Sequence, residues 1–187
     1  MKILYLDCSM GAAGDMLTAA LLELLPDPDA FLARLNALGI PGVRFEKESA
    51  IKCGISGTHM HVYVDGEEEG ADGAADASAH GHGHDHRHLS DIEAIVNGLP
   101  VPEAVKEDVI AVYRTIAEAE SKVHGRPVEE VHFHEVGAMD AVADVTAVCL
   151  LMHEIAPDET VVSPFTSAAE LSAARTGSCR CPRPRPN

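Results

Sequence analysis

The sequence ILYLDCSMGAAGDMLTAALLELL, residues 3–25, carries the clearest structural pattern in the chain. It begins with a short apolar run that is typical of a buried strand. Small residues around Gly11 and Gly14 then favour a turn. From Met16 the apolar residues recur at helical spacing until Pro26 ends the pattern. The stretch therefore predicts a strand, a glycine turn and a helix.

The same patterns continue beyond this stretch and alternate between helix and strand. Helical spacing of apolar residues predicts helices within 29–38, 90–96, 102–124 and 140–154. Short extended segments are predicted within 43–48, 55–64, 131–134 and 160–162. Ser90 and Glu93 have the spacing of a capping box, which places the start of the third helix at Ser90. We therefore expect an α/β or mixed α+β domain with a small mixed sheet.

One internal segment differs from the rest of the chain. Residues 65–88 contain no apolar side chain larger than Ala. Such a segment buries too little surface to offset the entropy lost on ordering, so we predict a disordered loop that interrupts the domain. The predicted organisation is 1–64, an acidic and His-rich loop at 65–89, the helical remainder of the domain at 90–165, and a disordered tail at 166–187.

Charge and composition exclude several classes of function. The 187 residues carry a formal net charge of −16 and include 11 His. This acidity argues against a protein that binds nucleic acid or an anionic membrane, because both need a basic surface. No apolar stretch approaches the ~20 residues that span a bilayer. The five cysteines form no CxxC pair and indicate reduced thiols in a cytoplasmic protein.

The internal loop contains a dense run of histidines. Residues 80–88 read HGHGHDHRH, with imidazoles at alternate positions separated mostly by glycine. Neutral imidazole is a good ligand for nickel, copper and zinc, and glycine spacers let several rings surround one ion. An expression tag or a solvated linker is the alternative, but a tag would be terminal and contiguous. We therefore assign metal capture to His80, His82, His84, His86 and His88.

A second group of metal-ligating residues lies at 131–144. On a strand, His132 and His134 would share one face. On the helix that follows, Asp140 and Asp144 are one turn apart. Two imidazoles opposite two carboxylates predict a metal or acid–base site, with Glu135 beside them, although Asp140 alone could be a helix cap.

The glycine turn near the N-terminus allows three interpretations. A strand, a turn and a helix N-terminus favour anion binding through backbone N–H groups at Gly11, Gly14 and Asp15. Asp7 and Asp15 could instead hold a cation, or the turn could serve close packing only. The turn lacks the Lys-Ser/Thr pair of a Walker A motif. His59 and His61 share one face of a predicted strand and could extend a metal path from the loop.

Three of these motifs together resemble one known family. The stretches LDC-SM-GAAGDM at 6–16, AEAE with HG at 117–125, and VHFHEVGAMD at 131–140 are similar to the nickel-insertion proteins of nickel-pincer nucleotide cofactor synthesis (LarC-type). The internal His-rich loop also occupies the position where that family carries one. The resemblance covers about residues 1–165.

The resemblance implies a function. Members insert Ni²⁺ into a pyridinium bisthiocarboxylate mononucleotide with formation of Ni–S and Ni–C bonds, and they require CTP and a divalent cation such as Mn²⁺ or Mg²⁺. The product serves enzymes of the lactate racemase type, so such an apoenzyme is an implied partner. Homo-oligomerisation is left open. The family also continues into a C-terminal domain, so this chain would be its N-terminal, nickel-loading portion and incompetent alone for CTP-dependent turnover.

The last 22 residues depart from the family pattern. Residues 1–165 carry a net charge of −19, whereas residues 166–187 carry +3. Codons for the sequence that the family carries here, when read one base later, encode the residues that this chain has at Thr166–Glu170 and Cys179–Pro182. We therefore predict an out-of-frame tail, from a programmed frameshift or a sequence error.

Two other functions remain open from the sequence. One is a non-catalytic nickel storage protein or metallochaperone. The other is a metal-dependent hydrolase built on His132, His134 and Asp140. The candidate catalytic residues are His132, His134, Glu135 and Asp140.

Overall fold

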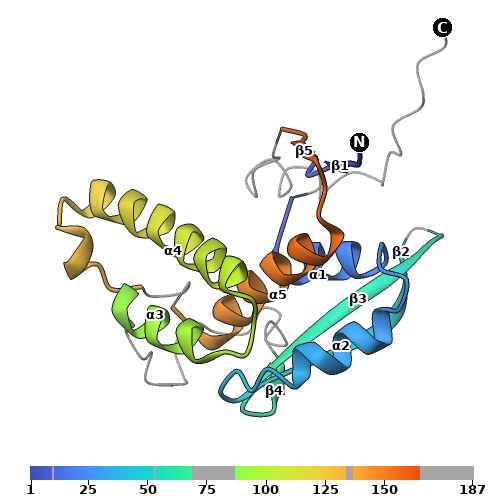
Figure 1. Ribbon diagram of the computed structural model, residues 1–187, viewed down its shortest axis with the longest axis horizontal. Helices are drawn as coiled ribbons and strands as arrows, with labels where there is room; N and C mark the ends of the chain where they lie inside the picture. The colour runs from blue at the N-terminus through green and yellow to red at the C-terminus, as the bar shows by residue number, and fades with distance from the viewer. Residues whose placement is uncertain (10, 53, 69–86, 134–136, 165–187) are drawn as a thin grey trace, which may run out of the picture.

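The computed structural model of the chain describes residues 1–9, 11–52, 54–68, 87–133 and 137–164 (Figure 1). These ranges contain helices together with parallel and antiparallel strands, which confirms the predicted mixed α/β class. Of the His-rich segment, the structure describes only the end, at Arg87 and His88. Positions 69–86, most of the predicted loop, and the tail from 165 onward lie outside the described residues.

The strand–turn–helix prediction at the N-terminus is confirmed. Strand β1 (Ile3–Leu6) pairs in parallel with β5 (Glu159–Val162) near the other end of the described chain. Helix α1 (Gly14–Leu22) follows the turn and lies beside α5 (Met139–Ile155). The turn therefore connects a two-stranded sheet to the middle of the molecule (Figure 1).

A long antiparallel hairpin forms the second sheet. Strands β2 (Val43–Lys52) and β3 (Ile55–Val64) pair along their whole length, and short β4 (Glu67–Glu68) adds to the edge of β3. Residues 67–68 are therefore ordered, although the sequence predicted a loop from residue 65. Backbone pairing with β3 orders them, since they bring no apolar side chain. Helix α2 (Pro28–Asn36) runs alongside this sheet (Figure 1).

The remaining helices complete the core. They are α3 (Leu89–Gly98), α4 (Glu103–His124) and a short 3₁₀ turn at Val128–Glu130. Helix α5 lies in the middle of the molecule, where it packs against α1 on one side and α4 on the other (Figure 1). The largest fully buried side chains come from α1, α2, α3, α4, α5 and residue 133, and include Tyr113, Phe31, Phe133, Leu21 and Ile92. Across the described ranges, no helix is both long enough and apolar enough to cross a membrane.

Two local predictions around residue 88 and residue 132 are wrong. Helix α3 is preceded by His88, whose backbone N–H donates to the Asp91 carboxylate at 2.8 Å, so the Ser90 capping box is not used. Residues 131–133 form no strand, and only an isolated bridge joins Arg87 to Phe133. The N–H of Phe133 donates to the carbonyl of Arg87 at 3.0 Å. The bond to Arg87 fixes residue 133. The cap differs from the prediction because Asp91, three positions after His88, takes the place expected for Glu93.

Asn36 at the end of α2 fixes the helix to the hairpin. Its side-chain amide donates to the carbonyl of Phe45 at 3.0 Å and accepts from the N–H of Phe45 at 2.8 Å. Asn36→Ala is therefore expected to lower the free energy of unfolding by about 1–2 kcal/mol in urea titrations. Asn97→Ala is the matched control, because Asn97 is exposed at the end of α3 and its side chain makes no such pair within the described residues. Equal losses in the two variants would contradict this role of Asn36.

Candidate functional site

Two sequence motifs meet where α1 begins. Gly14 is the first residue of α1, and a Cβ atom at this position would lie 2.4 Å from the Cβ of Asp144 on α5. Glycine is therefore required for the two helices to approach this closely. The backbone N–H of Asp15 hydrogen-bonds to the Asp144 carboxylate. The turn at residues 11–15 and the carboxylates of α5 thus belong to one site.

This contact also involves the N-terminus of α1. The sequence left an anion site at Gly11, Gly14 and Asp15 as one interpretation. In the structure, a carboxylate of the chain itself accepts a hydrogen bond from Asp15. The anion site, the cation alternative at Asp7 and Asp15 and the packing role all stay predictions.

The carboxylates of α5 occupy an unusual electrostatic environment. Asp140 and Asp144 are one helical turn apart, as the sequence predicts. Burial, and then the charges of Asp15 and Asp140, raise the pKa of Asp144 to about 7. Each of the two residues has a buried Oδ1 atom without a hydrogen-bond partner among the described residues. The site therefore holds acidic oxygens that are only partly satisfied by this part of the protein.

Tyr113 and Arg87 border these carboxylates. Tyr113 on α4 is completely buried, and its hydroxyl has no hydrogen-bond partner in the part of the chain that the structure describes. Burial, then the charges of Asp140 and Asp144, raise its pKa well above the ordinary value, while Arg87 opposes this shift. The Arg87 guanidinium donates to the carbonyl of Gly137 at 2.8 Å, just before α5. A cation and a buried phenol thus lie near the same carboxylates.

The structure also brings the end of the His-rich segment to the second motif. The rings of His88 and His132 lie 4.1 Å apart, centroid to centroid. The neighbouring backbone bond between Arg87 and Phe133 holds the two segments together. Gly137 lies close to Phe133, and a Cβ atom at position 137 would be only 2.8 Å from the Cβ of Phe133. Glycine is therefore needed for this close approach. The sequence did not predict that His88 and His132 are close, because the two residues are far apart along the chain.

Not all predicted ligands can be located. His80, His82, His84, His86, His134 and Glu135 lie outside the described residues. The structure describes His88, His132, Asp140 and Asp144, as well as Gly11, Gly14 and Asp15. Among these, it brings Asp144 to Gly14 and Asp15, and it brings His88 to His132. The predicted ligand set at residues 132–144 stays a prediction.

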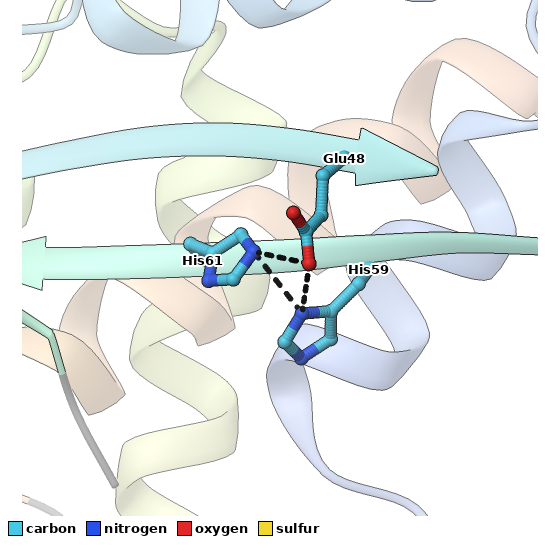
Figure 2. A group of neighbouring side chains, drawn as sticks. All are labelled: Glu48, His59 and His61. Carbon is cyan, nitrogen blue, oxygen red and sulfur yellow. Dashed lines mark hydrogen bonds and ion pairs between the residues drawn. The ribbon is translucent and has the colours of Figure 1, made fainter. Parts of the chain in front are cut away.

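A second group of side chains lies on the hairpin. Glu48 projects from β2 between the rings of His59 and His61, which project from β3 (Figure 2). One ligand atom from each of the three residues lies within 4.8 Å of the others. The hydrogen bond from His61 to Glu68, followed by Glu48, raises the pKa of His61, although burial opposes this shift.

Sequence reasoning placed His59 and His61 on one face but missed Glu48. The register pairs Glu48 with His59, and the strands connect through positions 53 and 54. Gly54 has a φ of +79°, which suits a tight turn between strands. The sequence therefore contained enough information to predict that Glu48 faces His59, because a two-residue connection at 53–54 places residue 48 opposite residue 59.

Comparison with known proteins gives the family. The sequence model of the family described as "Nickel insertion protein" matches residues 4–186. The chain belongs to the nickel insertion protein family. The predicted resemblance is thereby confirmed over most of the chain. No solved structure matches the chain.

Several curated relatives in this nickel insertion family share one name. A protein of Geobacillus kaustophilus named "Pyridinium-3,5-bisthiocarboxylic acid mononucleotide nickel insertion protein" is 35% identical over 165 residues, which cover 88% of this chain and 39% of the relative. Proteins of the same name from Clostridium kluyveri and Desulfitobacterium hafniense (strain DSM 10664 / DCB-2) are 38% and 33% identical. They are matched over 88% and 98% of this chain and over 40% and 42% of their own length. The chain thus spans about two fifths of their length.

The extent of these matches bears on the tail. The family match ends at residue 186, and the Desulfitobacterium alignment covers 98% of the chain. The Geobacillus and Clostridium alignments cover only 88% of the chain, so the extent of the matches does not decide the origin of residues 166–187. The out-of-frame origin stays a prediction, which the nucleotide sequence would test.

Proposed function

We propose that this chain binds nickel and supplies it for insertion into pyridinium-3,5-bisthiocarboxylic acid mononucleotide. Family membership supports the nickel-insertion role. The main observation behind the proposal is the contact between His88 and His132, whose ring centroids are 4.1 Å apart. It joins the end of the His-rich segment to the motif that precedes the carboxylates of α5. This contact supports transfer of a captured metal from the segment to the ligands predicted at 132–144.

The proposed roles follow the chemistry of the side chains. Imidazoles separated by glycine suit capture, since they can surround an ion without imposing one rigid geometry. Capture is assigned to His80, His82, His84, His86 and His88. The metal or substrate site is assigned to His132, His134, Glu135, Asp140 and Asp144. In this scheme nickel is the cargo that the chain delivers.

The remaining requirements are assigned to a longer protein. The chain spans about two fifths of its curated relatives, so the use of CTP and of Mn²⁺ or Mg²⁺ in a lyase-type insertion is proposed for a protein of their full length. A cytoplasmic location and delivery to a lactate racemase-type apoenzyme belong to the same proposal. This chain alone is then expected to bind nickel without CTP-dependent turnover.

A nickel storage protein or metallochaperone is the second candidate. The glycine-spaced histidines at 80–88 favour it, because such a run can hold and release nickel without further chemistry. Incubation of the chain with nickel, CTP and the pincer precursor distinguishes the two. Metallated nucleotide in the mass spectrum identifies an inserting enzyme, whereas nickel exchange without that product identifies a chaperone.

Replacing the histidines of the segment tests the capture role. The variant keeps His88, which precedes α3. It carries serine in place of His80, His82, His84 and His86. Calorimetric titration with Ni²⁺ is expected to show about one ion fewer per chain than the wild type. His124→Ser and His153→Ser, on exposed positions of α4 and α5, are the controls. Unchanged stoichiometry in the fourfold variant would remove the capture role and favour the hydrolase.

A further inference from the structure

We propose that Glu48, His59 and His61 form a second, ordered site for a borderline divalent transition metal on the β2–β3 hairpin. The identity of the metal as nickel rests on the proposed function, but the site itself rests on geometry. None of the three residues belongs to the His-rich segment or to the motif at 131–140. Figure 2 shows the carboxylate of Glu48 directed toward both rings.

The distances between the ligand atoms suit one shared ion. Nδ1 of His59 and Nε2 of His61 are 3.1 Å apart, and Oε1 of Glu48 lies 3.3 Å from that Nε2 and 3.7 Å from that Nδ1. Metal–nitrogen and metal–oxygen bonds in proteins are about 2.1 Å, so two ligands of one ion are separated by no more than about 4.2 Å. All three separations fall below this limit.

Glu68 supplies the outer contact that metal-bound histidines usually have. Its carboxylate pairs with Nδ1 of His61, on the side of the ring away from Glu48. A proton held at Nδ1 by Glu68 leaves the lone pair on Nε2, which is the atom that faces His59 and Glu48. A carboxylate that orients a ligating histidine in this way is the common second contact of metal sites.

The hairpin holds these residues in place by burying the opposite face. Met60 and Val62, which alternate with the two histidines along β3, are 2% and 4% exposed. The outward face is therefore fixed as the side of His59 and His61. The side chains of His61 and Glu48 are 16% and 62% exposed, so the site has an ordered base and an open side. Water or a donor ligand can complete the coordination there.

No cation of β2, Lys52 included, forms an ion pair with Glu48 in the described residues. Arg44 pairs with Glu46, and Lys47 pairs with Asp29. Within the described parts of the chain, the ion pairs of Glu48 are with the two imidazoles alone. Two close ring nitrogens and a carboxylate without a fixed cation are a donor set suited to nickel or zinc.

The hairpin is followed in sequence by the His-rich segment and borders a groove that reaches α1. Glu68 is the last described residue before the His-rich segment. His59 lines a groove between α1 and the hairpin, and Asp15, which hydrogen-bonds Asp144, lines the same groove. We therefore assign to the hairpin the role of an ordered stage between capture and the carboxylates of α5.

Nickel titration in a chain without the segment's histidines tests the site. The background is the full chain with serine at positions 80, 82, 84 and 86, and circular dichroism checks that every variant is folded. This background is expected to keep one site of about one ion per chain, and His59→Gln or Glu48→Gln is expected to weaken it about a hundredfold or more, since even an outer contact is worth 10–100-fold. Glu68→Gln is expected to weaken it about tenfold.

A matched pair elsewhere provides the control. Glu120 and His124 on α4 lie 3.0 Å apart but lack a second imidazole, so Glu120→Gln is expected to leave nickel binding unchanged. If the wild type binds nickel and the background does not, the hairpin site is wrong while segment capture stands. If the background binds nickel equally well with and without Glu48→Gln, the hairpin site is also wrong. If the wild type itself binds no nickel, the proposed function fails as well.

Discussion

Replacement of Gly14 by alanine is expected to lower the free energy of unfolding of this chain by about 3 kcal/mol. The new Cβ atom would lie 2.4 Å from the Cβ of Asp144 and 2.5 Å from its Oδ2. A contact to a Cβ atom on a helix cannot be relieved by rotating a side chain, so α1 and α5 must move apart. Overpacking of this kind typically costs 1–3 kcal/mol, and the helices involved also carry the candidate site. Urea unfolding followed by circular dichroism measures the loss.

Two further variants make this result specific. Gly98→Ala, at the end of α3, meets no atom within 4 Å and is expected to change stability by less than about 1 kcal/mol. Asp144→Gly in the Gly14→Ala background removes the opposing Cβ and is expected to recover part of the loss, whereas Asp144→Ala is not. Equal losses for Gly14→Ala and Gly98→Ala would show that the close contact is not what limits position 14.

Asp144→Asn is expected to stabilise the chain at alkaline pH and not at acid pH. Burial, Asp15 and Asp140 raise the pKa of Asp144 from 3.8 to about 7 in the folded state. The raised pKa means that the folded state favours the protonated carboxyl. This contribution is complete below pH 3.8 and is lost as the pH rises through 7. Above pH 7 the wild type therefore folds with a partly buried charge, which asparagine avoids.

The raised pKa of Asp144 also sets the expected size of the stabilisation by Asp144→Asn. A shift of this size corresponds to about 4 kcal/mol, and partial exposure of the carboxyl reduces the expected gain to about 2 kcal/mol. Urea titrations in EDTA at pH 8 and pH 4.5 should show the difference shrinking toward acid pH. Asp108→Asn, on an exposed position of α4, is the control and should change stability by less than about 0.5 kcal/mol. A gain for Asp144→Asn that is equal at both pH values would contradict burial of the charged carboxylate as its cause.

Local sequence predicted the elements whose determinants are local. The apolar run at Ile3–Leu6, the alternation at Ile55–Val64 and the helical spacing before Ile155 each correspond to an element of the structure. The capping prediction at Ser90 was wrong because His88 and Asp91 make the cap. The strand prediction at residue 132 was wrong because the bond between Arg87 and Phe133 fixes that segment. A contact across 46 positions leaves no trace in a local pattern.

At the candidate site, too, the sequence predicted local features but not tertiary contacts. Asp140 and Asp144 could be placed on one helical face, since their spacing is intrinsic to the helix. Their contact with Gly14 could not be predicted, because the packing of α1 on α5 sets it. Glu48 was missed because its partners lie on the neighbouring strand, where register and not spacing brings residues together.

Equilibrium dialysis of the wild-type chain against Ni²⁺, followed by metal analysis, tests nickel handling most directly. Nickel should be retained at about two ions per chain when millimolar Mg²⁺ is present, because imidazole ligands favour nickel over the harder cation. Retention should fall in the fourfold serine variant and fall further when Glu48→Gln is added. A wild-type chain that retains no nickel, or that loses it to Mg²⁺, would contradict the proposed role of this chain in nickel insertion.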